Sequence, residues 1–433
     1  MSNNAELDSS KHLKQEQATP TDVRALWITY LNIVLYALCY QCIQPVEPFL
    51  VQSLSKDSAD SDSVARRYGQ LLAFFSTIQT IGSPLVGIML DRIGVRKASA
   101  IVFAASAVSY AILASAQDMR LLFLSKIPTA LQHAFLVAQA TAATSTRGNE
   151  GARAAALARM TTAYTIGATV GPTLGGILAS HGDLYSGARL AVLGSLVSMI
   201  LSLLFLPDTS GSKNQLSKKS FRSDIQHQAR LALQASLFPL LIVKVAGGIT
   251  SSMHSTALPL VLTQELHFPP ALLGFAMSSS MLAVATFGAV VMAPLTKLLG
   301  SNGLTHYGLV ARVLWGGLLA FLVTSSTGAN HPTQIIILTS VLRELSSHAL
   351  ATGLTTQTTG AVSTEEQGAL LGLEHGLFSL ARIVGPPLGT FLLTRMDTFW
   401  AVATACSCLD ISLIALLMRY RDQINSGQKS KSK

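Results

Sequence analysis

The sequence predicts an all-α membrane protein, with twelve transmembrane helices in two pseudo-symmetric six-helix halves and both termini in the cytoplasm. Composition, apolar block length and the placement of positive charge predict this fold. Of the 433 residues, 49% are apolar and 12% are charged, whereas a soluble domain carries about 25% charged residues. A soluble chain of this length would lack the charges to cover its surface.

Twelve apolar blocks are long enough to cross a bilayer, which takes about 20 residues of helix. Six precede a polar stretch and six follow it: 26–50, 68–90, 98–116, 121–143, 157–180 and 188–206, then 235–263, 271–296, 305–327, 334–357, 369–394 and 399–418. The predicted organisation is therefore a disordered cytoplasmic leader (1–24), an N-terminal bundle (25–206), a cytoplasmic linker (207–234), a C-terminal bundle (235–418) and a basic cytoplasmic tail (419–433).

The distribution of Lys and Arg supports this count. With both termini on one side, that side holds 21 of the 31 basic residues, the other side holds six, and four lie deeper inside blocks. Cytoplasmic loops of membrane proteins carry such an excess. The net charge of +9 therefore reports topology, and no nucleic-acid partner is expected.

Metal, cofactor and catalytic sites are not expected. The four cysteines occur as two close pairs, Cys39 with Cys42 and Cys406 with Cys408, and no further Cys or His at metal-ligand spacing accompanies them. The sequence also lacks the Gly-x-x-x-x-Gly-Lys-Ser/Thr motif of ATP-driven pumps. The protein is not expected to be an enzyme.

The two halves contain an internal repeat. Gly171-Pro172 in the fifth block and Gly385-Pro386 in the eleventh lie 214 positions apart, and His133 and His348 in the fourth and tenth blocks lie 215 apart. Two matches at nearly one offset indicate a duplicated six-helix unit, as in transporters that bind their solute between two halves.

Two motifs at matching places then point to a family. Residues 87–97 resemble the G-x-x-x-D-R-x-G-x-R-K signature of the major facilitator superfamily, through Gly87, Asp91, Arg92, Gly94, Arg96 and Lys97. Residues 167–176 resemble its fifth-helix antiporter motif, through Gly167, Gly171, Pro172, Gly175 and Gly176. Stretches 125–134, 241–246 and 368–373 are most similar to the organic-cation-transporter-like solute carriers of the drug:proton antiporter type, and the likeness covers nearly all of 25–418.

Two departures qualify the resemblance. Lys126 stands where the drug antiporters have arginine, and residues 296–300, the second-half counterpart of the Asp91 loop, contain no acid. The resemblance implies that the Asp91 loop is a latch that holds one access state, although positive-inside anchoring alone would also explain its basic residues. Glycines at every fourth position share one helix face and allow close helix contact, so residues 167–176 are expected to form a gate contact.

Ionisable residues inside spans are costly and therefore mark functional candidates. The resemblance implies that the first, fourth, seventh and tenth spans line the solute cavity. The proposed solute and proton pathway comprises Gln41, Gln44, Glu47, Lys126, His133, Lys244, His254, Arg343, Glu344, His348 and Arg382. Seven-residue spacing predicts that Lys126 and His133 share a helix face, and four-residue spacing makes Glu344 and His348 a candidate pair. Ion pairs that only hold helices together are the alternative.

These features predict a secondary transporter that works by alternating access. The expected reaction is exchange of a small organic solute, amphipathic or cationic, for protons. Tyr40, Phe135, Tyr164 and Phe378 are candidate aromatic surfaces for a cation, or packing residues. The protein is expected to be monomeric, in contact with membrane lipid, in the plasma membrane or an organelle membrane. An organic anion, uniport, or a receptor or scaffold without transport remains an alternative.

Overall fold

The computed structural model describes residues 20–55, 61–146, 150–208, 230–325, 332–363, 366–396 and 398–421, which are helical apart from short connections. Most of the predicted leader, linker and tail lies outside these ranges. The elements are α2 (Pro20–Ile43), α3 (Glu47–Leu54), α4 (Ser61–Ala114), α5 (Met119–Leu124), the 3₁₀ turn η2 (Ile127–Leu131), α6 (Ala134–Ser145), α7 (Glu150–Ser180), α8 (Ser186–Phe205), α10 (Phe238–Gln264), α11 (Pro270–Thr286), the π-helical turn η3 (Phe287–Val291), α12 (Met292–Ser325), α13 (Thr333–Gly360), α14 (Gln367–Met396) and α15 (Phe399–Arg419).

Each of the twelve apolar blocks falls mostly on helix, and two of them are interrupted. In the described part of the chain, seven helical stretches are long and apolar enough to cross a membrane, and two of these, Ser61–Ala114 and Pro270–Ser325, contain 54 and 56 residues. Such lengths are more than twice what one crossing needs. That the chain crosses the membrane twelve times, and that both termini are cytoplasmic, remain predictions from the sequence.

Both long stretches bend sharply at a glycine. Gly94 has φ 77° and ψ 171°, and Gly300 has φ 67° and ψ 170°. Glycine adopts positive φ without the steric cost that a Cβ would impose. The two bends occupy corresponding places in the two halves, so the structure repeats the internal symmetry of the sequence.

Prolines interrupt two of the expected spans. The first block divides at residues 44–46, where α2 ends and α3 begins at Glu47. The fourth divides into α5, η2 and α6 around Pro128, and this proline contributes no amide hydrogen to a helix there. The expectation that Lys126 and His133 share one helix face is therefore wrong, since no continuous helix joins them.

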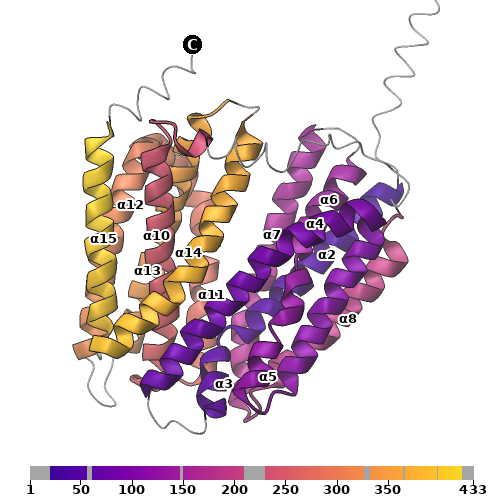
Figure 1. The fold of residues 1–433 in the computed structure, drawn as a ribbon, viewed down its shortest axis with the longest axis horizontal. Helices are drawn as coiled ribbons and strands as arrows, with labels where there is room; N and C mark the ends of the chain where they lie inside the picture. The colour runs from indigo at the N-terminus through magenta and orange to yellow at the C-terminus, as the bar shows by residue number, and fades with distance from the viewer. Residues whose placement is uncertain are drawn as a thin grey trace, which may run out of the picture.

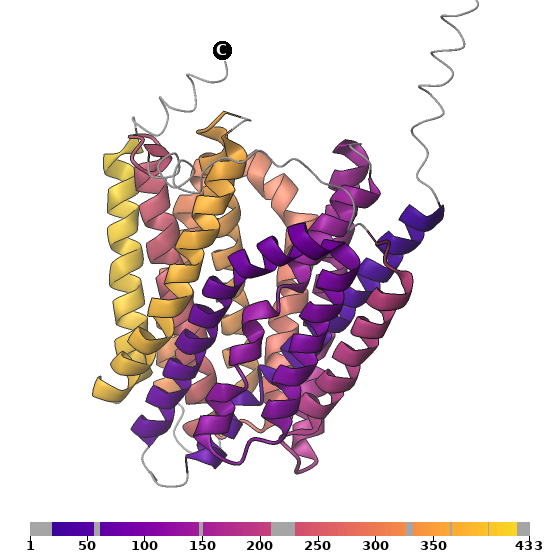
Figure 2. The same cartoon turned by 45° about the vertical axis from the view of Figure 1, so that its right-hand side comes forward.

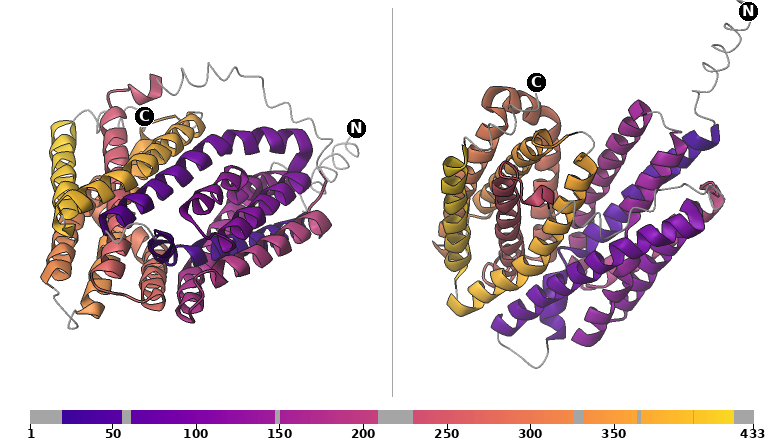
Figure 3. Two further views of the ribbon diagram at one scale, coloured as in Figure 1. Left: turned by 60° about the horizontal axis from the view of Figure 1, so that its bottom comes forward. Right: turned by 45° about the horizontal axis from the view of Figure 1, so that its top comes forward.

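The helices form two bundles, α2 to α8 and α10 to α15 (Figure 1). We call the end where α2 begins and α15 ends the terminal face, and the opposite end, which carries α3, the loop face. The bundles diverge toward the terminal face and converge at the loop face (Figure 2), and α4 crosses beside α14 in the tilted views as well (Figure 3).

The apolar core follows the same division. One cluster of buried side chains spans both bundles toward the loop face and includes Leu50 and Val64 with Leu260 and Phe399. The other clusters each stay within one bundle. Apolar burial therefore joins the bundles at the loop face alone among the described residues.

Glycines allow the closest helix contacts. A Cβ on Gly167, Gly171 or Gly175 of α7 would overlap atoms of α2, and a Cβ on Gly385 or Gly389 of α14 would overlap α10 in the same manner. A further contact joins the bundles near the loop face, where Gly176 of α7 lies against the backbone of Pro270, and Gly274 of α11 lies against the backbone of Pro172. The predicted gate motif thus occupies a close interface.

Candidate functional site

A buried ion pair joins Glu47, the first residue of α3, to Lys126 at the break in the fourth span. The exposed fractions of the two side chains are 5% and 10%. They border a cavity of about 20 Å³, which has room for about one water molecule. The break after α2 and the break in the fourth span therefore bring Glu47 and Lys126 together. Nothing in the sequence around either residue indicates that the two form a pair.

An aromatic shelf, formed by Tyr36, Tyr40 and Phe75, covers this pair. The rings of Tyr40 and Phe75 stack with centroids 5.9 Å apart, and Tyr36 stacks on Tyr40 at 6.4 Å. The Lys126 ammonium lies 5.6 Å from the Phe75 centroid, and the Arg382 guanidinium of α14 lies 5.9 Å from it. The shelf thus brings a cation from each bundle to one ring.

A larger cavity, of about 770 Å³, opens between α7 and α11. Its lining includes three threonines of α7, Tyr164, the η3 turn and His348 of α13. The His348 ring meets Phe287 edge to face at 6.5 Å and lies against Gly288. Isolated π turns often occur at functional sites. Tyr164 lies near Gln41, Tyr40 and Arg382, so this residue lies between the larger cavity and the aromatic shelf.

A second ion pair lies in the C-terminal bundle. Lys244 Nζ is 2.6 Å from Glu374 Oε2 of α14, and Lys244 donates a hydrogen bond to Thr355 Oγ1 at 3.0 Å. Thr358 donates to the other Glu374 oxygen at 2.7 Å. These contacts tie α10, α13 and α14 together. Lys244 is among the residues predicted from the sequence, whereas its partner Glu374 is not.

Three proposed pathway residues line neither of the two cavities described above: His254, Arg343 and Glu344. His254 and Arg343 are each 2% exposed within the C-terminal bundle. His254 packs against Phe399 with ring centroids 5.5 Å apart, and Arg343 Nη1 lies 3.9 Å from Glu344. Among the described side chains no ion pair joins Glu344 to His348, and the His348 ring lies against Phe287 instead. Deeper in this bundle, Arg312 Nε lies 3.1 Å from Asp410.

The remaining polar candidates lie on the N-terminal side. Gln44 borders the small cavity beside Glu47, and Gln41 is buried next to Tyr164. His133 occupies the N-cap position of α6 without a capping hydrogen bond from its side chain, and it is half-buried. Its ring lies near the backbone of Gln79, and its Nε2 has no partner among the described residues.

The Asp91 loop lies at the terminal face. Asp91 and Arg92 are exposed, and Gly87 has open space where a Cβ would lie. In the described ranges, Asp91, Arg92, Arg96 and Lys97 form no ion pair. The predicted latch residues are therefore without ion pairs among the described residues in this conformation, in which the bundles diverge at that face (Figure 2).

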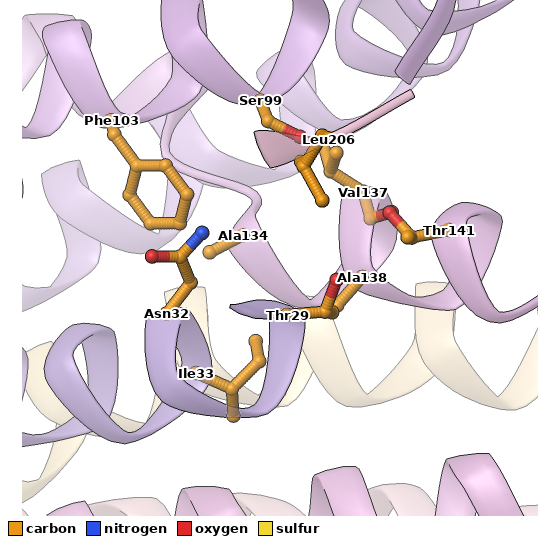
Figure 4. A pocket seen from close by; sticks show the side chains of 10 residues that line it. All are labelled: Thr29, Asn32, Ile33, Ser99, Phe103, Ala134, Val137, Ala138, Thr141 and Leu206. Carbon is orange, nitrogen blue, oxygen red and sulfur yellow. The ribbon is translucent and has the colours of Figure 1, made fainter. Parts of the chain in front are cut away.

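A further pocket, of about 10 Å³, lies inside the N-terminal bundle (Figure 4). Its lining is Thr29, Asn32, Ile33, Ser99, Phe103, Ala134, Val137, Ala138, Thr141 and Leu206. Asn32 donates a hydrogen bond to Ser202 Oγ at 3.1 Å. The lining carries no ionisable side chain, so this pocket is not part of the candidate site. Across the described residues, no cluster of three His, Cys, Asp or Glu side chains fits a metal ion.

Comparisons with known proteins agree with this architecture. The family model of the Major Facilitator Superfamily matches residues 29–245 and 240–433. Solute carrier family 22 member 18 of Mus musculus is 27% identical over 84% of this chain and 88% of its own length. Tetracycline resistance protein, class D, of Salmonella ordonez is 26% identical over 92% of this chain and 97% of its own length.

Solved structures share the fold. The nucleoside transporter NupG aligns with a TM-score of 0.74 at 12% identity, covering 92% of this chain and 99% of that one. The human organic anion transporter MFSD10 aligns with a TM-score of 0.64 at 19% identity, covering 92% of this chain and all of that one.

Proposed function

Because the chain belongs to the Major Facilitator Superfamily, a family of multi-pass integral membrane transporters, we propose that it exchanges a small organic solute for protons by alternating access. The observation that carries the proposal is the buried pair of Glu47 and Lys126 under the aromatic shelf. The resemblance of residues 167–176 to the antiporter motif, and their close packing against α2, support exchange as the mode.

The pair of Glu47 and Lys126 offers a direct way to couple solute binding to proton release. A cationic group on the solute would take the place of Lys126 at the Glu47 carboxylate. An ammonium group that loses its carboxylate partner in a buried site favours its neutral form, so Lys126 would release its proton as the solute binds. When the solute leaves, reprotonated Lys126 would return to Glu47. One positive charge enters the site for each proton that leaves it.

The two faces of the molecule suggest the access cycle. At the loop face, Gly274, Pro172 and the shared apolar core close the path. At the terminal face the residues of the Asp91 latch form no ion pair within the described ranges. We propose that the terminal face is cytoplasmic, since the excess of Lys and Arg falls on that side, and that this conformation is therefore open to the cytoplasm.

Proton release from the purified protein in weakly buffered detergent tests the coupling. Wild type should release about one proton for each organic cation bound, and Glu47→Gln should abolish the release. Asp183→Asn is the control, because Asp183 forms an exposed pair with Arg189 outside the proposed pathway; it should behave as wild type. A cation that binds wild type without proton release would refute exchange through this pair.

A further inference from the structure

Arg382 differs from the other basic residues of the proposed pathway, because it lacks an acidic partner. Lys126 pairs with Glu47, Lys244 with Glu374 and Arg343 with Glu344. Within the described part of the chain, no carboxylate lies within 4 Å of Arg382. The half-buried side chain instead lies over the Phe75 ring. The neighbourhood of the shelf therefore carries one uncompensated positive charge.

Polar groups that suit an anion surround this charge. Tyr36 and Tyr164 lie near Arg382, and a tyrosine hydroxyl can donate a hydrogen bond to an anion. In this conformation the Tyr36 hydroxyl donates to the Gln132 carbonyl at 3.5 Å. A guanidinium binds a carboxylate or phosphate through two parallel hydrogen bonds, and it can stack on an aromatic face at the same time. A solute with only a positive charge would be repelled here and would leave Arg382 unpaired.

The ion pair of Glu47 and Lys126 lies close to Arg382. The Lys126 ammonium and the Arg382 guanidinium lie within about 12 Å of each other, because each is less than 6 Å from the Phe75 centroid. Glu47 contacts Lys126 directly. A negative group of the protein and an unpaired positive group thus flank one aromatic shelf, Glu47 from the N-terminal bundle and Arg382 from the C-terminal bundle.

We propose that the solute is an aromatic zwitterion. Its cationic group replaces Lys126 at Glu47, its acidic group binds Arg382 with Tyr36 and Tyr164, and its ring packs on the shelf. This inference rests on the proposed exchange function, because the cationic group is the one that displaces the proton. It adds that the site recognises the acidic group of the solute as well as its cationic group.

Three isosteric probes test the proposal. Para-(2-aminoethyl)benzoate carries both charges, para-isopropylphenethylamine only the positive one and para-propylbenzoate only the negative one. Isothermal titration of wild type should show that the zwitterion binds at least tenfold more tightly than either relative. Arg382→Gln should weaken zwitterion binding at least tenfold and leave the amine unchanged or tighter, whereas Arg382→Lys should give an intermediate loss for the zwitterion.

The chain offers a matched control in Arg395→Gln. Arg395 lies on the same helix and also covers a ring, Phe391, at 5.7 Å, but it is exposed beyond the site; its replacement should leave all three affinities unchanged. Equal binding of amine and zwitterion, loss of amine binding in Arg382→Gln, or no binding of any probe would overturn the inference. Proton release by the amine in wild type would still support exchange, whereas bound probes that release no proton would refute exchange itself.

Discussion

The buried pair of Glu47 and Lys126 makes a quantitative prediction about stability. Removing one partner leaves the other charge buried without compensation, which costs about 3–5 kcal/mol. We therefore expect Glu47→Leu and Lys126→Met each to lower the free energy of unfolding by about this amount. Replacing both charges with apolar side chains is often close to neutral, so the Glu47→Leu/Lys126→Met double variant should recover most of the loss.

The pair of Asp183 and Arg189 in a loop-face turn provides the control. Its oxygen and nitrogen lie 2.6 Å apart, but the side chains are 36% and 64% exposed. Exposed pairs contribute about 0–1 kcal/mol, so Asp183→Asn should cost less than 1 kcal/mol.

Unfolding in mixed micelles titrated with sodium dodecyl sulfate measures the loss of unfolding free energy for the buried pair and for the exposed control. A buried single variant that costs as little as the exposed control would contradict the burial argument. So would a double variant that loses the sum of the two single losses, because independent losses mean that the charges do not interact. A stable double variant that releases no proton would separate the structural role of the pair from its coupling role.

Two further predictions concern the loop face. Gly274→Leu should separate the bundles there, because the new side chain would overlap the Pro172 carbonyl. A cysteine introduced at Ser278 should then react with a maleimide at least tenfold faster than it does without this change. The control Gly317→Leu, at a position with open space around it, should leave that rate unchanged. The pKa of Asp183 lies below its ordinary value of 3.8, chiefly because the backbone N–H two residues further on donates to the carboxylate. This folded-state stabilisation is present above the ordinary pKa and is lost as the pH falls through the lower one, so Asp183→Asn should flatten the acid limb of thermal stability below about pH 4.

The sequence predicts the elements of this fold better than its contacts. Apolar block length locates the helices, and four-residue glycine spacing identifies the contact of α7 with α2, because both signals are local. Pro128 marks the break in the fourth span, but a proline alone does not predict one, because α7 continues through Pro172 and α14 through Pro386 and Pro387. The seven-residue spacing of Lys126 and His133 indicates a shared face only where the helix is continuous.

The charge pairing required the structure. Glu47 and Lys126 lie 79 positions apart in different blocks, and a single sequence carries no signal that joins them. The same holds for Glu374, which faces Lys244 on another helix. Phe75 is one of 16 phenylalanines, and nothing in its local sequence distinguishes a ring that two cations share from a ring in the core.

The positions of the charges suggest why a solute with two poles suits alternating access. The pairs of Glu47 with Lys126 and of Lys244 with Glu374 each lie within one bundle, so rocking of the bundles leaves them intact. The contact of Arg382 with Phe75 joins the two bundles. A ligand shifts a conformational equilibrium only through contacts that differ between the states. A solute held by Glu47 on one side and Arg382 on the other makes such contacts, because it links the bundles and favours their closure around it. A solute with a single charge binds one bundle and provides no link, so the loaded zwitterion would be the species that drives the transition.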